Sequence, residues 1–281
     1  MMTYLVTGSK GQLGSIFVDI LPDDLVIGID LPEYDITDVE SVRKVFDCNS
    51  IDYVIHCAAY TDVDGCARNP EQAMLVNAIG TETVANLCAE YDATMILLST
   101  NEVFNGNKLY SYVEWDEPSP INSYGQSKLA AEKITEEVLD NYFIVRTSWM
   151  YAIGGVNFLH SILKLARFGK EISVVTDELG APTYANDLAI AILELIKRAP
   201  YGVYHLVNSG NVSRYGLARR LLDLTGYNSV DIQPILLGDY KRDSRPPRKG
   251  ILANWEAYKY GVVLRPWQTA LEEFLTNLRY L

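Results

Sequence analysis

The sequence predicts an α/β protein built on a doubly wound parallel sheet, with a smaller C-terminal part interleaved with that sheet. Short apolar runs alternate with amphipathic segments through roughly the first half of the 281 residues. A glycine-rich turn follows the first apolar run, and polar residues follow several of the later ones. Strands that are apolar throughout are typical of a parallel sheet covered by helices on both faces.

The first half supplies the expected sheet and its helices. We expect strands at residues 3–8, 25–30, 52–59, 93–100 and 142–151, and helices at residues 12–21, 39–47, 70–91 and 124–139. Each strand is a short run bounded by turn residues, and each helix has apolar residues at helical spacing. Pro70 at the start of the third helix is typical of a first helical turn.

The alternation becomes looser after about residue 150. We expect helices at 155–169, 185–199, 213–227 and 266–279, a strand at 202–208 and a loop at 240–254. Ser213 is the expected N-cap of the third of these helices, because its hydroxyl can accept a hydrogen bond from the first turn.

Composition and charge narrow the class of partner. No apolar run approaches the roughly 18 residues that a membrane span needs, and the first residues lack the pattern of a signal peptide. The net charge of −12 repels nucleic acid and anionic membranes. The cysteines form no CxxC pair and only three histidines are present, so we predict a reduced, cytoplasmic protein without a metal site.

A GxxGxxG turn joins the first expected strand to the first expected helix. Its glycines, Gly8, Gly11 and Gly14, permit a tight turn, close approach of the backbone to a pyrophosphate, and close packing of helix on strand. The start of the helix also offers unpaired N–H groups to phosphates. The turn therefore predicts a Rossmann-type dinucleotide site, which also includes Lys10, Gln12 and Leu13.

The second expected strand ends in Asp30, 16 residues after Gly14. A carboxylate there accepts hydrogen bonds from the adenosine ribose and repels a 2′-phosphate, which favours NADH. Lys10 in the glycine-rich turn can reach the same region and would favour NADPH, so the sequence leaves both NADH and NADPH as candidate cofactors. Asp35 and Ile36 are expected beside the adenine. On this basis residues 1–150 form a dinucleotide-binding domain, with returning segments near 175–210, and residues 151–281 form mainly the substrate-binding part.

Tyr124 and Lys128 stand four residues apart at the start of an expected helix, so their side chains share one face. A nearby ammonium is expected to lower the pKa of the phenol, and the pair would then donate a proton to a carbonyl oxygen during hydride transfer. Thr100 ends the fourth expected strand. Ligands gather at the carboxyl ends of such strands, so Thr100 is expected to orient the reacting carbonyl.

Taken with the sequence Cys57-Ala58-Ala59, with Asn77 and with Ser99, these motifs resemble the extended short-chain dehydrogenase/reductases, which act mostly on nucleotide sugars. Downstream segments at 146–151, 177–189, 202–218, 245–254 and 265–275 resemble the dTDP-4-dehydrorhamnose reductases. The resemblance implies reduction of a nucleotide-linked 4-ketosugar with NADPH or NADH, and a homodimer as one compatible assembly. It also implies cofactor contacts from Cys57, Ala58, Ala59, Tyr60, Asn77 and Ser99.

The residues after Thr100 depart from the related families. The 4,6-dehydratases carry Thr-Asp-Glu at this strand end, and similar reductases usually carry Thr-Asp-Tyr, whereas this chain has Thr100-Asn101-Glu102. Asn101 has no usable acidic proton, so water elimination lacks its acid. Glu102 is expected in the substrate pocket, with a solvent-facing role and a proton-abstracting role in an epimerase-reductase as the alternatives.

Arginines and an aromatic residue complete the expected substrate site. Arg245 and Arg248 lie in a basic loop of an acidic chain, and arginine pairs well with diphosphate oxygens. Trp149 is expected by resemblance to pack on the sugar, and Val63 to line the pocket. Another 4-ketosugar reductase remains an alternative, as does a non-catalytic regulatory subunit like that of methionine adenosyltransferase, which shares this ancestry.

Overall fold

The computed structural model describes residues 2–22 and 25–280. Its central sheet has six parallel strands in the order β10-β5-β4-β3-β1-β2, and the direction of winding reverses between β1 and β3, as in doubly wound folds. The predicted fold class is confirmed. The strands are β1 (Tyr4–Thr7), β2 (Val26–Ile29), β3 (Tyr53–His56), β4 (Thr94–Thr100), β5 (Tyr142–Thr147) and β10 (Gly202–His205).

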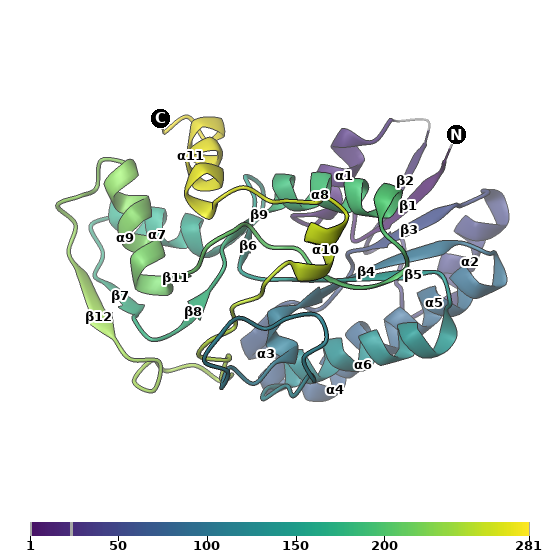
Figure 1. Cartoon of the computed structure of the whole chain (residues 1–281), viewed down its shortest axis with the longest axis horizontal. Coiled ribbons are helices and arrows are strands. Elements are labelled where there is room, and N and C mark those ends of the chain that lie inside the picture. The colour runs from purple at the N-terminus through teal and green to yellow at the C-terminus, as the bar shows by residue number, and fades with distance from the viewer. Residues whose placement is uncertain (1, 23–24, 281) are drawn as a thin grey trace.

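Helices cover both faces of this sheet (Figure 1). Successive side chains of a strand point to opposite faces, so Leu5 and Val6 of β1 belong to two different hydrophobic clusters. The Val6 face packs against α1 (Gly14–Ile20), α8 (Ala185–Arg198) and α10 (Trp255–Lys259). The Leu5 face packs against α2 (Val39–Cys48), α5 (Gly80–Glu90) and α6 (Ser123–Val138).

The long helix predicted at 70–91 has three consecutive parts. They are α4 (Pro70–Met74), the π-helical turn η1 (Leu75–Ile79) and α5. A π-helical turn inside an α-helix is rare and often lies at a functional site. The sequence pattern showed the apolar face of the helix but not this local widening, because the hydrophobic spacing barely changes across one turn.

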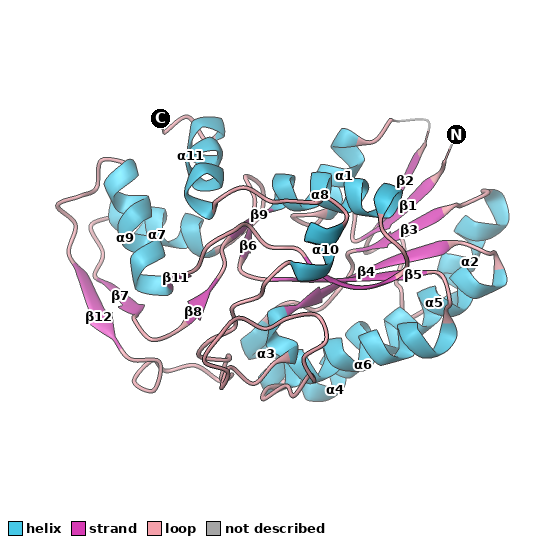
Figure 2. Ribbon diagram, viewed as in Figure 1, coloured by secondary structure: helices cyan, strands magenta, loops and turns pink. Residues whose placement is uncertain are grey.

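A smaller lobe has its own hydrophobic core, at the left of Figures 1 and 2. It is built from α7 (Phe158–Arg167), α9 (Arg214–Leu224) and α11 (Trp267–Asn277), whose buried side chains form one hydrophobic cluster. Three short strand pairs brace it: β6 (Met150–Tyr151) with β9 (Thr183–Tyr184), β7 (Ile172–Val175) with β12 (Ile232–Ile235), and β8 (Leu179–Gly180) with β11 (Val212–Ser213). The division of the chain at residue 150 stays a prediction.

Further short elements were not expected from the sequence, among them α10, α3 (Val63–Arg68) and the 3-10 turn η2 (Asn101–Val103). The turn η2 follows β4 directly, and α3 lies in the connection after β3. Within residues 2–22 and 25–280, no helix combines the length and apolar character needed to cross a membrane.

Candidate active site

A cavity of about 740 Å³ lies where the carboxyl ends of the main strands face the smaller lobe. This position is the usual ligand site of a doubly wound sheet. Most of the residues predicted for the cofactor and substrate sites line the cavity. They are Gly8, Gly11, Gln12, Leu13, Gly14, Asp30, Asp35, Ile36, Cys57, Ala58, Ala59, Val63, Ser99, Thr100, Glu102, Tyr124, Lys128 and Trp149.

The glycine loop is packed too tightly for side chains at two of its positions. Gly8 has a positive φ of 66°, and a Cβ atom on Gly14 would lie 2.1 Å from the Gly8 carbonyl oxygen. Gln12 extends from this loop to the opposite wall, where its Nε2 donates to the Val156 carbonyl over 3.2 Å and its Oε1 accepts from Asn157 over 3.3 Å. The loop therefore combines close backbone approach with a contact across the cavity.

Replacing Gly14 by alanine should weaken dinucleotide binding by about 10-fold or more, since the new methyl group displaces the Gly8 carbonyl and with it the turn. The measurement is the dissociation constant of NADPH and NADH by fluorescence titration. Gly238→Ala is the matched control, because a Cβ atom there meets nothing within 4 Å. Unchanged cofactor binding by Gly14→Ala would contradict a phosphate-binding role for this loop.

Asp30 fastens the end of β2 to the glycine loop. Its Oδ2 accepts a hydrogen bond from the backbone N–H of Lys10 at 2.8 Å, and its Oδ1 accepts one from that of Leu31 at 2.7 Å. The Lys10 ammonium lies outside the cavity lining, because it donates to the Leu31 carbonyl at 3.0 Å and pairs with Glu33 at 2.8 Å. Asp30 at the strand end thus lines the cavity, whereas the Lys10 ammonium is held by Leu31 and Glu33.

Thr100, Tyr124 and Lys128 come together in the cavity from β4 and the first turns of α6. Asn122 caps this helix by accepting the N–H of Gly125 at 2.8 Å. The expectation that the pKa of Tyr124 is lowered is wrong: burial raises it and the nearby Glu102 carboxylate raises it further, while a hydrogen bond with Thr100 acts in the opposite direction. A phenol with a raised pKa stays protonated at neutral pH, which suits a proton donor.

Burial lowers the pKa of Lys128, whereas it raises that of Tyr124. Desolvation lowers the pKa of this ammonium to about 8, although the Glu132 carboxylate partly offsets that effect. Because Lys128 is buried at the bottom of the cavity, its charge has few water molecules to screen it. Lys128 therefore changes charge within the range of pH where enzymes are assayed.

The titration of Lys128 predicts that kcat/KM depends on pH. The ammonium form predominates below pH 8 and is lost as the pH rises through about 8, and only this form can stabilise negative charge that develops nearby during a reaction. We expect kcat/KM, which reports groups of the free enzyme, to fall through that region in the unaltered protein. In Lys128→Met, the value should be low and the fall near pH 8 absent. A wild-type profile that stays level through pH 8 would contradict this role.

Two predicted cofactor residues, Asn77 and Tyr60, support the site from outside the cavity lining. Asn77, buried in η1, accepts the Tyr60 N–H at 2.7 Å and donates to the Tyr60 carbonyl at 3.1 Å and to the Ser127 hydroxyl at 2.9 Å. These bonds connect the segment after β3 to α6. Asn77 and Tyr60 thus hold the helix that presents Tyr124 and Lys128.

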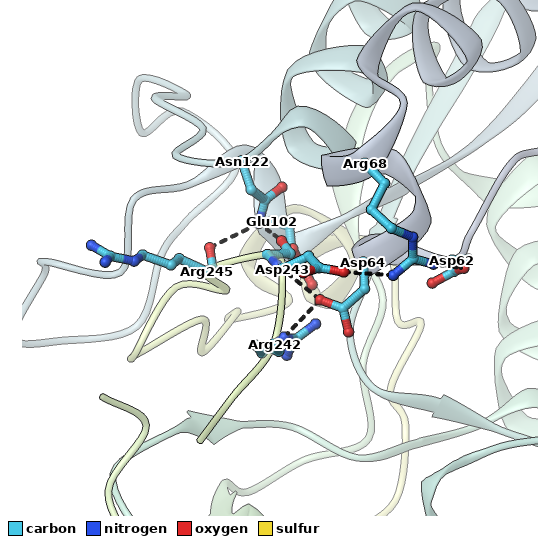
Figure 3. Close-up of polar contacts among 9 residues, drawn as sticks. Asp62, Asp64, Arg68, Glu102, Asn122, Arg242, Asp243 and Arg245 are labelled. Carbon is cyan, nitrogen blue, oxygen red and sulfur yellow. Dashed lines mark hydrogen bonds and ion pairs between the residues drawn. The ribbon is translucent and has the colours of Figure 1, made fainter. Parts of the chain in front are cut away.

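Glu102 lines the cavity beside Tyr124. Its Oε2 accepts a hydrogen bond from the Asn122 amide at 2.6 Å (Figure 3). Burial raises the pKa of this carboxyl, the Asn122 bond lowers it, and Glu178 raises it again. The same Asn122 amide group donates to the Arg245 carbonyl at 3.1 Å, so one residue orients Glu102 and holds the basic loop.

Arg245 and Arg248 do not form the predicted diphosphate clamp. Neither lines the cavity; Arg248 pairs with Asp177, and the Arg245 side chain points away from Glu102 (Figure 3). The loop is instead fastened to α3, where Asp64 accepts from Arg242 at 3.1 Å and from the Ser244 N–H at 2.8 Å. A run of basic residues in the sequence shows that positive charge is present, but it does not show which side chains enter the cavity.

Arg214 is a charged cavity residue that sequence reasoning missed. Its guanidinium carbon lies 3.6 Å from the ring centroid of Trp149, and its Nε donates to Glu178 at 3.1 Å. It is the first residue of α9 and lines the cavity opposite the main sheet. Its position after the expected N-cap Ser213 was visible in the sequence, but the approach of α9 to Trp149 was not.

A parallel sheet with a glycine loop, and a cavity that unites this loop with Thr100, Tyr124 and Lys128, define the extended short-chain dehydrogenase/reductase class. Comparison with known proteins narrows that class. The chain belongs to the RmlD substrate binding domain family, whose profile matches residues 2–280. The predicted resemblance is confirmed.

Relatives in this family extend over nearly the whole chain. The spore coat polysaccharide biosynthesis protein SpsK of Bacillus subtilis is 35% identical over 98% of this chain and 97% of its own length. A dTDP-4-dehydrorhamnose reductase of Mycolicibacterium smegmatis is 34% identical over 96% of this chain and 84% of its own. The crystal structure of the Bacillus anthracis dTDP-4-dehydrorhamnose reductase in complex with NADP has 34% identity, covers 99% of this chain and 100% of its own, and gives a TM-score of 0.94.

Proposed function

We propose that this protein reduces the C4 ketone of a nucleotide-linked 6-deoxyhexose with NADPH or NADH, converting dTDP-4-dehydro-L-rhamnose to dTDP-L-rhamnose. The observation on which the proposal rests is the single cavity that joins the glycine loop to Thr100, Tyr124 and Lys128. The names of the Mycolicibacterium smegmatis and Bacillus anthracis relatives support the substrate and the cofactor class.

The cavity residues divide the chemistry between them. The glycine loop and Asp30 would hold the reduced cofactor, which would supply the hydride that adds to the ketone carbon C4. Tyr124 donates its phenolic proton to the ketone oxygen as that oxygen gains negative charge, which is general acid catalysis. Thr100 donates a hydrogen bond to the same oxygen and orients the ketone. The Lys128 ammonium stabilises the negative charge left near the phenol.

The test is an oxidation assay that follows NADPH and NADH separately with dTDP-4-dehydro-L-rhamnose and several other nucleotide-linked 4-ketosugars. We expect turnover with the rhamnose precursor above that with the others. Cofactor oxidation with none of these sugars, in a protein that binds the cofactor, would favour the non-catalytic regulatory subunit. Preferred turnover of a different 4-ketosugar would assign the same chemistry to that sugar.

One observation keeps an epimerase-reductase as the second candidate, namely the Glu102 carboxyl in the cavity beside Tyr124. A carboxylate at this place is able to take a proton from a carbon next to the ketone. Incorporation of solvent deuterium into the product at such a carbon, lost in Glu102→Gln, would distinguish this reaction from simple reduction.

We place the reaction in the cytoplasm, in keeping with the free cysteines, and propose a homodimer as the assembly.

A further inference from the structure

If the proposed function is correct, the cavity needs positive charge for the substrate as well as for the cofactor. It must accommodate two diphosphate groups, one of the cofactor and one of the nucleotide sugar, inside a chain of net charge −12. A local cation is needed to hold an anion in such a field. Among the described residues that line the cavity, the lysine and arginine side chains are Lys128 and Arg214. Lys128 lies one helical turn from Tyr124 at the reacting end, so Arg214 is the cation available for a diphosphate.

Arg214 is held rigidly before any ligand arrives. Its backbone N–H donates to the Glu178 carbonyl at 3.2 Å, and its Nε donates to the Glu178 carboxylate at 3.1 Å. Its guanidinium stacks on Trp149 at 3.6 Å, and Phe158 lies 5.2 Å away. Within residues 2–22 and 25–280, no hydrogen bond from either Nη atom to another residue is present. The planar fork is therefore fixed in place with its two terminal amino groups unused.

The aromatic support of Arg214 is itself specially arranged. Trp149 has a positive φ of 45°, which is an uncommon conformation for a bulky residue. A Cβ atom on Gly180 would lie 2.5 Å from the indole, so only glycine at that position leaves room for the ring. Strained backbone at a cavity wall is typical of ligand sites. The Trp149 indole is thus held as a platform that fixes the orientation of the guanidinium.

Arg214 also faces the reacting end of the cavity. Arg214 lines the same cavity as Thr100, Glu102 and Tyr124, and it is near enough to Glu102 for its charge to act on that carboxyl. A diphosphate bound there would be attached to a sugar whose ring reaches toward those residues. The cofactor pyrophosphate has a separate place at the glycine loop, on the wall formed by the main sheet.

We propose that Arg214 binds the diphosphate of the nucleotide sugar, with its two Nη groups directed at the phosphate oxygens, and that it replaces the clamp expected from Arg245 and Arg248. The proposal rests on the proposed function and assigns the residue that recognises this part of the substrate. A guanidinium fork fits paired phosphate oxygens better than an ammonium does. Arg214 is thus a specificity-determining residue of the same site.

The test measures binding by calorimetry, independently of turnover. The probes are dTDP, thymidine and NADPH, and the proteins are the unaltered chain, Arg214→Met and Arg245→Met. Methionine keeps an apolar stem over the indole while removing the charge. We expect Arg214→Met to weaken dTDP binding by about 10- to 100-fold, as for loss of hydrogen bonds to a charged group, with thymidine and NADPH binding unchanged. Arg245→Met should bind all three as the unaltered chain does, since its side chain lies outside the cavity lining.

The other outcomes separate this inference from the proposed function. Equal dTDP binding by Arg214→Met and the unaltered chain would overturn the inference and leave the reductase intact. An equal loss for dTDP and thymidine, which signals a structural role, would overturn it too, as would a loss confined to NADPH. Loss of dTDP binding in Arg214→Met, in a protein that reduces no nucleotide 4-ketosugar, would support the inference and remove the proposed reaction. No dTDP binding by the unaltered chain would overturn both.

Discussion

Replacing Tyr124 by phenylalanine should lower kcat by about 10²- to 10⁴-fold, the usual contribution of a positioned general acid. The phenol lies in the cavity on the capped first turn of α6, and burial raises its pKa, so it carries the proton at neutral pH. Phenylalanine keeps the ring and removes only the hydroxyl. Cofactor affinity should therefore change little while the chemical step slows.

Steady-state kinetics with the preferred 4-ketosugar, together with a fluorescence titration of NADPH, would measure the two effects separately. Tyr110→Phe is the matched control, because that side chain is 81% exposed and lies outside the cavity lining. Full turnover by Tyr124→Phe would remove the phenol from the mechanism. A large loss of NADPH affinity would mean that the hydroxyl mainly holds the cofactor.

Replacing Arg146 by methionine should lower the free energy of unfolding by about 3–5 kcal/mol, because it leaves an uncompensated carboxylate in the core. Arg146 and Glu132 are both buried, and their side chains form a two-point ion pair with an Nη2–Oε2 distance of 2.7 Å and an Nε–Oε1 distance of 3.0 Å. Glu132 also accepts the hydroxyl of Ser99 at the end of β4. The pair thus joins α6, β4 and β5 next to the proposed catalytic residues.

Urea denaturation of the single and double variants would test this pair. Glu132→Leu combined with Arg146→Met should recover most of the lost stability, since two apolar residues leave no buried charge. The exposed pair of Arg220 with Glu272 is the control, and Arg220→Met should cost less than about 1 kcal/mol. A loss for Arg146→Met as small as that for Arg220→Met would mean that water or a rearranged neighbour compensates Glu132.

Local patterns in the sequence predicted the main elements of the dinucleotide-binding half well. The strands end close to the expected residues, so Asp30 and Thr100 were placed correctly at the mouth of the sheet. Helix α6 begins one residue before Tyr124, and the four-residue spacing of Tyr124 and Lys128 was visible in the sequence. In the smaller lobe, strands of two residues such as β8 and β11 were missed, because they exist only through pairing with distant segments.

The sequence by itself determined the parallel sheet, the glycine loop and the shared face of Tyr124 and Lys128, because hydrophobic period and helical spacing are properties of neighbouring residues. Only the tertiary structure decided which charged side chains enter the cavity. Arg214 enters because α9 and β8 bring it against Trp149, whereas Arg245 points outward because Asn122 and Asp64 hold its loop by backbone groups. The tertiary structure also decided the raised pKa of Tyr124. Desolvation depends on everything packed around the phenol and not only on Lys128 one turn away.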